Sequence, residues 1–265
     1  MAMPAPVAIS ETARALARLY DVDLVDDPGD LDLYLALATR TGGPVLELAA
    51  GTGRVAVPLA AAGHAVTAVD LDAAMLERAR RRGEQAGVAV ADRLDLVEAD
   101  LLGLDLPAAG SYRFALIALN TLFLLATRDA QRAAFEVMAR HLEPGGLAVA
   151  DVWLPDADDL ARFDGRLVLE YERIDPESGL HVTKTASAQH DATTGIVNLT
   201  SVYEEGADGE PARRWIRRDA LRLVSADELR DFATGAGLTV ESLAGGYDLE
   251  ALGPGSDRAI VVARR

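Results

Sequence analysis

The chain has 265 residues, of which half are hydrophobic, and it carries a formal net charge of −16 and no cysteine. This length allows one large domain, or one domain with an insertion, around a full apolar core. The lack of cysteine excludes disulfides, thiolate metal ligands and cysteine nucleophiles, and the negative charge argues against a nucleic acid as partner, because its phosphates would be repelled.

The longest apolar run, residues 114–126, is interrupted by Asn120 and is too short to span a bilayer. The N-terminus lacks the basic and then apolar pattern of a signal peptide. We therefore expect a soluble cytoplasmic protein without a membrane partner.

Two helices are predicted before the first strand, over residues 10–20 and 31–41. They contain Tyr20 and Tyr34, which stand out because only 5% of the residues are aromatic. Packing with a satisfied hydroxyl is one interpretation of both side chains. Residues 1–43 are predicted to form a helical cover.

The stretch 45–54 (VLELAAGTGR) is an apolar strand that runs into a glycine-rich loop, a pattern typical of nucleotide binding. Gly51 and Gly53 allow positive φ and a close approach of the backbone to a ligand. The run 51–56 also satisfies a dinucleotide fingerprint, G-x-G-x-x-G/A. Glu47, near the end of the strand, argues against a pyrophosphate and favours a ligand with a cationic, amino-acid-like part.

Two further predicted strands, over residues 65–70 and 94–100, each end in a carboxylate. Asp70 follows the glycine loop by about 20 residues, a spacing at which an acidic side chain accepts hydrogen bonds from a ribose. Its alternative interpretation is a cap on the helix that begins near Asp72. For Asp100 the alternative is a residue of a turn.

A fourth strand, residues 114–119, is predicted to lead into Asn120 and a helix that starts near Thr127. The Pro-Gly-Gly sequence at 144–146 is predicted to end this helix and to turn the chain into a fifth strand. The β/α alternation from residue 44 to 154 therefore indicates a doubly wound parallel sheet.

The pattern changes between residues 166 and 224, where four strand-like runs are separated by hairpin connectors at 175–179, 191–195 and 205–211. This predicts an antiparallel meander inserted into the α/β domain. A sheet in this position would cover the crevice at the carboxyl ends of the strands, where open α/β sheets bind ligands. Residues 161–224 are thus the predicted lid for an acceptor.

A capping box at residues 225–228 predicts the start of another helix, and strands over 239–243 and 259–263 are predicted to complete the sheet. The predicted α/β domain therefore consists of residues 44–160 and 225–265.

These landmarks, in this order, resemble the class I S-adenosylmethionine-dependent methyltransferases, whose loop reads E/D-x-G-x-G-x-G; Ala49 replaces the first glycine here. The resemblance implies a seven-stranded Rossmann-like sheet with an antiparallel last strand. It also implies that Asp100 binds the adenine amino group, the Leu101 backbone the ring edge, and the N-terminal tyrosines the methionine part of the cofactor. The implied cofactor-binding residues are Tyr20, Tyr34, Glu47, Ala49, Gly51, Gly53, Arg54, Asp70, Leu71, Met75, Asp100, Leu101, Asn120 and Leu125.

The inserted sheet is similar to that of small-molecule N-methyltransferases that act on glycine or on amino sugars. A histidine that many sugar N-methyltransferases carry after the fourth strand is replaced here by Leu124. Candidates for the acceptor pocket are Phe123, Trp153, Trp215 and Arg217, with core packing as the alternative for the tryptophans and a solvated edge strand for the arginine.

We expect transfer of a methyl group from S-adenosylmethionine to a small molecule, with an amine nitrogen as the favoured acceptor. Methylation of oxygen or carbon in secondary metabolism is one alternative, and cofactor binding without methyl transfer is another. The sequence assigns no catalytic residue, and Tyr20 and His190 are only weak candidates. No metal is expected, and a homodimer is an expected assembly.

Overall fold

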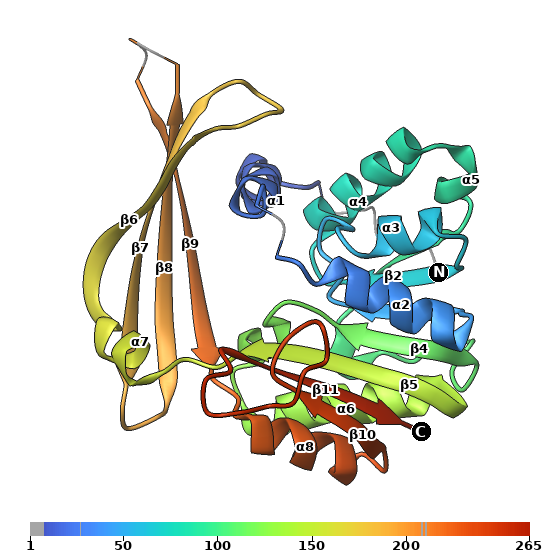
Figure 1. Cartoon of the computed structure of the whole chain (residues 1–265). Coiled ribbons are helices and arrows are strands. Elements are labelled where there is room, and N and C mark those ends of the chain that lie inside the picture. The colour runs from blue at the N-terminus through green and yellow to red at the C-terminus, as the bar shows by residue number, and fades with distance from the viewer. Residues whose placement is uncertain (1–7, 27, 208, 210) are drawn as a thin grey trace, which may run out of the picture.

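The computed structural model describes residues 8–26, 28–207, 209 and 211–265. Two β-sheets dominate it: a seven-stranded sheet with helices on both faces, and a four-stranded sheet that stands beside it (Figure 1). Helix α1 lies between the two sheets. The predicted doubly wound α/β fold with an inserted antiparallel sheet is confirmed. The first seven residues of the predicted N-terminal cover lie outside the described residues.

The seven-stranded sheet has the strand order β10-β11-β5-β4-β1-β2-β3. β1 pairs in parallel with β2 and β4, whereas β11 is antiparallel to both β5 and β10, as predicted for the last strand. The order reverses between β1 and β4, which places a ligand crevice at the carboxyl ends of these strands. The strands span Val45–Leu48 (β1), Val66–Asp70 (β2), Leu94–Glu98 (β3), Tyr112–Ile117 (β4), Leu142–Trp153 (β5), Thr239–Ala244 (β10) and Arg258–Arg264 (β11).

Helices cover both faces of this sheet. α6 and α8 pack on one face, where the rings of Phe135 and Phe232 lie 6.0 Å apart, and α2 and α3 pack on the other, where Tyr34 and Leu59 are buried. The capping box predicted at Ser225 is present at the start of α8. The helices span Glu11–Asp23 (α1), Leu31–Thr41 (α2), Ala56–Ala61 (α3), Ala73–Ala86 (α4), Val88–Ala91 (α5), Arg128–His141 (α6), Ala157–Arg162 (α7) and Ala226–Gly235 (α8), with short 3₁₀ turns at Leu101–Gly103 (η1) and Thr121–Leu124 (η2).

The Pro-Gly-Gly segment differs from its prediction as a turn before the fifth strand. It lies inside β5, which begins directly after α6. The pairing with β4 shifts there, because Tyr112 is opposite Leu142 whereas Phe114 is opposite Leu147. Gly145, with φ of 88°, allows the extra residues to bulge out of the strand. The segment therefore bends a strand that is already paired.

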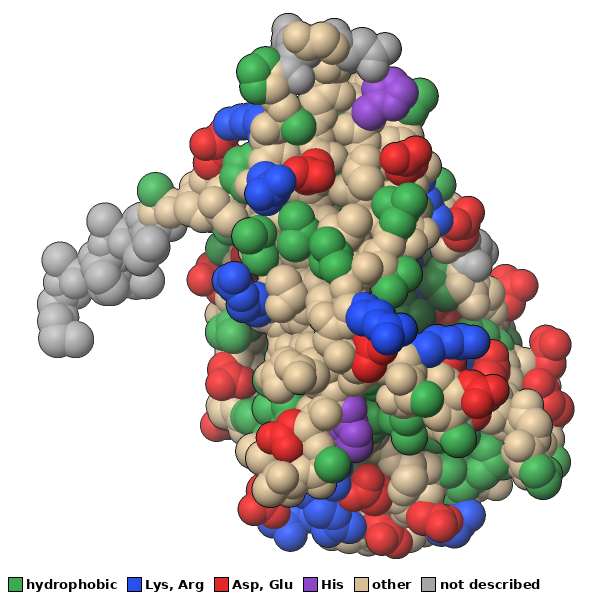
Figure 2. Space-filling view, turned by 90° about the vertical axis from the view of Figure 1, so that its left-hand side faces the viewer, with side chains coloured by type: hydrophobic (Ala, Val, Ile, Leu, Met, Phe, Trp, Pro, Cys, Tyr) green, Lys and Arg blue, Asp and Glu red, His purple; other side chains and the backbone are tan. Residues whose placement is uncertain are grey.

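The four-stranded sheet, called the lid sheet below, is an antiparallel meander in the order β6-β7-β8-β9. One face lies toward the seven-stranded sheet, and Figure 2 views the other face, which is in contact with solvent. Residues 208 and 210 of the predicted connector 205–211 lie outside the described residues. The strands span Asp164–Ile174 (β6), His181–Asp191 (β7), Ile196–Gly206 (β8) and Arg213–Arg222 (β9).

Helix α1 connects the two sheets through charged side chains. Arg18 forms ion pairs with Asp175 and Glu205 of the lid sheet. Two residues of α4 hold the other side of the helix, since Asp21 pairs with Arg78 at 2.7 Å and with Arg82 at 3.0 Å. The position of the lid sheet therefore depends on α1. Within the described ranges, no helix is long and apolar enough to cross a membrane.

Candidate functional site

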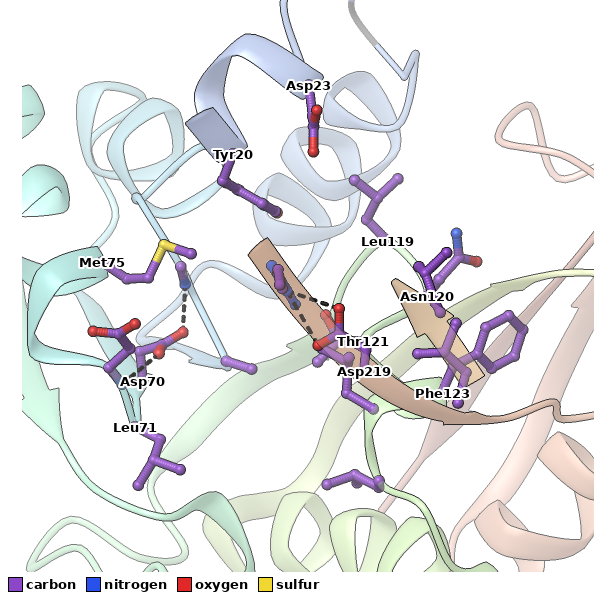
Figure 3. Close-up of a pocket in the computed structure, with 18 of the residues that line it drawn as sticks. Tyr20, Asp23, Asp70, Leu71, Met75, Leu119, Asn120, Thr121, Phe123 and Asp219 are labelled. Carbon is purple, nitrogen blue, oxygen red and sulfur yellow. Dashed lines mark hydrogen bonds and ion pairs between the residues drawn. The ribbon is translucent and has the colours of Figure 1, made fainter. Parts of the chain in front are cut away.

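A cavity of about 870 Å³ lies between the carboxyl ends of the central strands and the lid sheet (Figure 3). Its walls come from α1, from the loops after β1 to β5, and from the inner face of β7, β8 and β9. Lining residues that the sequence predicted are Tyr20, Ala49, Gly51, Asp70, Leu71, Met75, Asp100, Leu101, Asn120, Phe123, Leu125, Trp153 and Arg217. The structure thus brings together residues that are far apart in the chain.

The glycine loop takes up backbone conformations that favour glycine. Gly51 and Gly53 have φ of 56° and 76°. A Cβ on Gly53 would lie only 3.0 Å from the Cβ of Ala79 in α4, so the loop and this helix approach closely. Ala49 has φ of 55°, which explains why a glycine suits this position in the related motif.

The side chain of Asp70 holds the glycine loop through hydrogen bonds to its backbone. Its carboxylate accepts hydrogen bonds from the backbone N–H of Gly51 at 2.7 Å and of Asp72 at 2.8 Å. The cap of α4 is Asp72, whose side chain accepts from Ala74. Burial raises the pKa of Asp70, while the backbone hydrogen bonds oppose this shift. Asp70 therefore lies in the cavity wall with an orientation set by the loop.

Glu47 is a buried carboxyl group beneath the same loop, with 3% of the residue exposed. Its Oε2 atom is buried and has no hydrogen-bond partner among the described residues. Burial raises the pKa of Glu47 to about 8, although the positive charge of Arg54 opposes the shift. Arg54 itself forms a bidentate ion pair with buried Asp30, with both N–O distances at 2.6 Å. An orphaned buried oxygen of this kind fits a cationic ligand group.

Residues after β4 form a second strained turn in the wall. Leu119 and Asn120 have φ of 52° and 63°, the left-handed region that non-glycine residues rarely adopt. The backbone N–H of Leu119 donates to Asp151 at 2.8 Å, and the side-chain oxygen of Asn120 accepts from the backbone N–H of Trp153 at 2.5 Å. These hydrogen bonds tie the ends of β4 and β5 together. Strained residues of this kind cluster at ligand sites.

The part of the cavity beside β2 and β3 has several apolar side chains in its wall. Leu71 is 71% exposed there, and Met75 and Leu101 line the same region. Asp100 caps η1 by accepting from the N–H of Leu102 at 2.9 Å. The alternative interpretation of Asp100 as a turn residue is therefore compatible with its place in the cavity wall.

The two N-terminal tyrosines have different surroundings. Tyr20 lines the cavity above the glycine loop, and burial raises the pKa of its hydroxyl (Figure 3). Tyr34 is fully buried and its hydroxyl donates to Asp151, so it lies in the core behind the site. Packing with a satisfied hydroxyl describes Tyr34, whereas Tyr20 faces the ligand space.

Four other predicted residues are not part of the cavity wall as the structure defines it. They are Glu47 and Arg54, which lie behind the loop, and Trp215 and His190, which lie on the lid sheet. The indole N–H of Trp215 donates to Glu205 at 2.9 Å, and the backbone N–H of His190 donates to Phe163. Gly53, as described above, faces α4.

Several polar residues that line the cavity were not predicted from the sequence. Asp23, at the end of α1, accepts hydrogen bonds from Tyr171 at 2.6 Å and Tyr203 at 2.7 Å, and pairs with Lys184 at 3.1 Å. Asp219 of β9 also lines the cavity. For Asp219 the only sequence signal was alternation along the lid strand, which gives a face but not what the face covers, and Asp23 had no motif. Among the described residues, no group of His, Asp and Glu is arranged to hold a metal ion.

Comparison with known proteins agrees with this geometry. Residues 45–146, which run from β1 into β5, match the family described as methyltransferase domain. The solved structure of the CcbJ methyltransferase from Streptomyces caelestis has the same fold, with a TM-score of 0.74 at 24% identity over 90% of this chain and 96% of that one. Residues 45–146 therefore form a methyltransferase domain, and the chain has the class I methyltransferase fold. This class uses S-adenosylmethionine as its cofactor.

Two curated relatives extend the methyltransferase-domain match. An uncharacterised protein of Mycobacterium tuberculosis is 34% identical over 163 residues, or 61% of this chain and 52% of the relative. The chain therefore spans about half the length of that relative. The cypemycin N-terminal methyltransferase of a Streptomyces species is 28% identical over 233 residues, which is 84% of each chain.

Proposed function

We propose that the protein transfers a methyl group from S-adenosylmethionine to a nitrogen atom of a small-molecule acceptor. The observation that carries the proposal is the orphaned carboxyl oxygen of Glu47 beneath a glycine loop that opens into the cavity. The cofactor has both a ribose and an amino-acid part with an ammonium group. Glu47 would bind the ammonium group, and Asp70 the ribose hydroxyls.

The remaining residues of the cavity wall suit the other parts of the cofactor. Leu71, Met75 and Leu101 would hold the adenine ring, and Asp100 would accept from its amino group. Tyr20 and Asn120 lie on opposite sides of the central space, where they would flank the methionine part (Figure 3). The bound cofactor supplies an activated methyl group, so the protein needs mainly to align the acceptor with it.

Alignment of the acceptor is the role that we assign to the lid sheet. Its inner face forms the wall of the cavity opposite the strand ends, where it would restrict the orientation of the acceptor. Correct orientation of two reactants supplies about 7 to 11 kcal/mol toward a barrier. A neutral amine then needs no strong base, which agrees with the absence of histidine from the residues that line this cavity in the described chain.

Nitrogen and a small acceptor are each supported by a separate observation. The cypemycin relative, which aligns over most of this chain, is named for methylation of an N-terminus. The net charge of −16 disfavours a nucleic acid acceptor. Methylation of oxygen usually needs a general base at the reacting atom, and no histidine is among the described residues that line the cavity.

The proposal is tested first by binding. We expect S-adenosylmethionine to raise the melting temperature of the protein, and Glu47→Gln to weaken this binding roughly 10- to 100-fold, because a hydrogen bond to a charged group is lost. Glu98→Gln is the matched control, since Glu98 is an exposed carboxylate at the end of β3. Equal binding by both variants, or no effect of the cofactor on melting, would contradict the proposal.

The second test follows the methyl group. Incubation with S-adenosylmethionine labelled at the methyl carbon should transfer the label into a pool of small amines but not into pools of phenols or carboxylic acids. Label in phenols alone would assign the enzyme to oxygen methylation. Cofactor binding without transfer to any pool would indicate a protein that binds the cofactor for another purpose.

A further inference from the structure

An ion pair lies in the middle of the cavity on the inner face of the lid sheet. Arg217 and Asp219 are two residues apart on β9, so both side chains point to the same side of the sheet. The Nε atom of Arg217 lies 3.1 and 2.8 Å from the two carboxylate oxygens of Asp219. In Figure 3 Asp219 lies between Asp70 on the cofactor side and Asn120 on the other side.

The other carboxylates that line the cavity have other roles: Asp72 caps α4, and Asp70 and Asp100 belong to the proposed cofactor site. Asp23 accepts two tyrosine hydroxyls and the Lys184 ammonium, as described above. Asp70 and Asp100 accept from backbone N–H groups of their own loops. Asp219 has no role in the cofactor site and receives hydrogen bonds from a single nitrogen of Arg217, whereas a carboxylate has about four acceptor positions. Acceptor capacity therefore remains at Asp219, next to the ligand space.

Apolar side chains form the neighbouring wall. Phe123, Trp153 and Phe163 line the cavity, and the rings of Trp153 and Phe163 lie 6.2 Å apart in an edge-to-face arrangement. On the lid sheet, Leu199 is directly opposite Asp219 in the pairing of β8 with β9, and Leu221 follows on the same face. A carboxylate beside an aromatic and aliphatic wall suits a ligand that joins a cation to an apolar body.

We propose that Asp219 binds the ammonium group of the acceptor, and that the acceptor is a primary or secondary amine on an apolar, aromatic or aliphatic body. This inference rests on the proposed methyl transfer, and it names the acceptor class and the residue that selects it. The pair with Arg217 holds the carboxylate in position before the amine arrives. The aromatic wall then orients the body of the acceptor. After the ammonium has lost a proton to water, the nitrogen lies on the cofactor side of the cavity.

The test compares two probes of the same shape. Benzylamine is an ammonium at neutral pH and benzyl alcohol is not charged, and both fit beside an aromatic wall. Each is titrated by ligand-observed NMR into the protein loaded with S-adenosylhomocysteine. We expect the wild type to bind benzylamine at least about tenfold more tightly, which is the size of a hydrogen bond to a charged group. Equal binding of the two probes, or no binding of benzylamine, overturns the inference.

Three variants identify the residue responsible. Asp219→Asn should abolish the preference for benzylamine, and Asp219→Glu should keep most of it. Glu204→Gln is the matched control, because Glu204 of β8 pairs with Arg214 at 2.5 Å but does not line the cavity. An unchanged preference in Asp219→Asn overturns the inference.

Melting with and without S-adenosylmethionine is measured on the same samples. A cofactor-dependent shift that persists in Asp219→Asn shows that the variant is folded and that its cofactor site is intact. A wild type without that shift refutes the proposed function itself. A wild type with the shift but without a preference for the amine refutes only the role of Asp219.

Discussion

The two sheets of this protein are stabilised by different interactions. The seven-stranded sheet is covered on both faces, and all four residues of β1 are buried. The lid sheet has an exposed edge strand, in which Leu167 and Leu169 are 63% and 56% exposed. It contacts α1 through ion pairs and tyrosine hydrogen bonds around a small apolar cluster with Leu19 and Tyr203. At the end of β9, Leu221 packs on the core of the seven-stranded sheet and Arg222 pairs with Glu228 of α8. The cofactor half, which is the seven-stranded sheet with its helices, is thus an apolar core, whereas the lid sheet is attached to α1 mainly by polar contacts.

This difference predicts which part of the fold each kind of substitution should affect. Changes beneath the glycine loop should affect the whole fold or the cofactor, because they disturb a close-packed interior. Changes at α1 should loosen the lid sheet and leave the seven-stranded sheet intact, because polar contacts connect the two. Four experiments separate these outcomes, beginning with the largest expected effect.

The buried carboxyl group of Glu47 should make the stability of the cofactor-free protein depend on pH. In the folded protein the pKa of Glu47 is about 8, above the ordinary value of 4.5. The contribution of Glu47 to the free energy of unfolding is therefore complete below pH 4.5 and is lost as the pH rises toward 8. The loss has a slope of up to about 1.4 kcal/mol per pH unit within this window. Urea unfolding between pH 5 and pH 8 should show this slope in the wild type and in Glu98→Gln, and a flatter dependence in Glu47→Gln. Parallel curves for all three proteins would refute the prediction.

Gly53→Ala should destabilise the cofactor half by about 3 kcal/mol, as the sum of a left-handed backbone conformation and overpacking. The new Cβ would lie 3.0 Å from the Cβ of Ala79. Gly63→Ala is the control, since Gly63 also has positive φ but has nothing within 4 Å of the same position. Its cost should be about 1 kcal/mol, the conformational part alone. Urea unfolding measures both, and equal costs would show that the contact with α4 is unimportant.

Asp23→Asn should weaken the attachment of the lid sheet by about 1 to 3 kcal/mol, because Tyr171, Tyr203 and Lys184 lose a charged acceptor. Amide hydrogen exchange should become faster in β6 to β9 and stay unchanged in β1 to β5. Asp26→Asn is the control. Asp26 also contacts the lid sheet, through Arg173, but its side chain is 82% exposed, so we expect no measurable change. Faster exchange throughout both sheets would mean that they unfold as one unit.

Ala49→Gly should have the smallest effect. Glycine removes the cost of the left-handed conformation at this position, but it increases the entropy of the unfolded chain. The net gain should be about 0.5 kcal/mol in urea unfolding, with cofactor affinity unchanged or slightly improved. Ala50→Gly is the control and should be destabilising, because the neighbouring Ala50 is buried and has no positive φ. A loss of stability in Ala49→Gly would show that the methyl group contributes packing that outweighs the strain.

The sequence predicted the cofactor half well because its signals are local. Parallel strands buried on both faces appear as apolar runs, and the residues that follow them meet at one edge of the sheet. Asp70, Asp100 and Asn120 could therefore be placed together from the sequence alone. The prediction of a turn at Pro-Gly-Gly was wrong, because β5 pairs with β4 on both sides of that segment and the segment is a bulge within the strand.

The role of the lid sheet and the surroundings of the N-terminal tyrosines were less predictable from the sequence. Alternation along β7 to β9 indicated two faces, but the same pattern fits a lid and a solvated sheet. Arg217 was proposed from its charge alone, while Asp219 was missed because a single acidic residue in a strand has no motif. Tyr34 could not be separated from Tyr20, since both are helical tyrosines and only tertiary packing buries one of them against Asp151.

The central strands, the glycine loop and the carboxylates at successive strand ends could be predicted from the sequence, because they follow from backbone conformation and from the period of apolar residues. The tertiary structure was needed to show which side chains share the cavity, since that depends on how α1 and the lid sheet dock. It also decided that Glu47 is a buried acid with an unpaired oxygen rather than a solvated one. Burial depends on contacts between residues distant in the chain, and no local pattern encodes them.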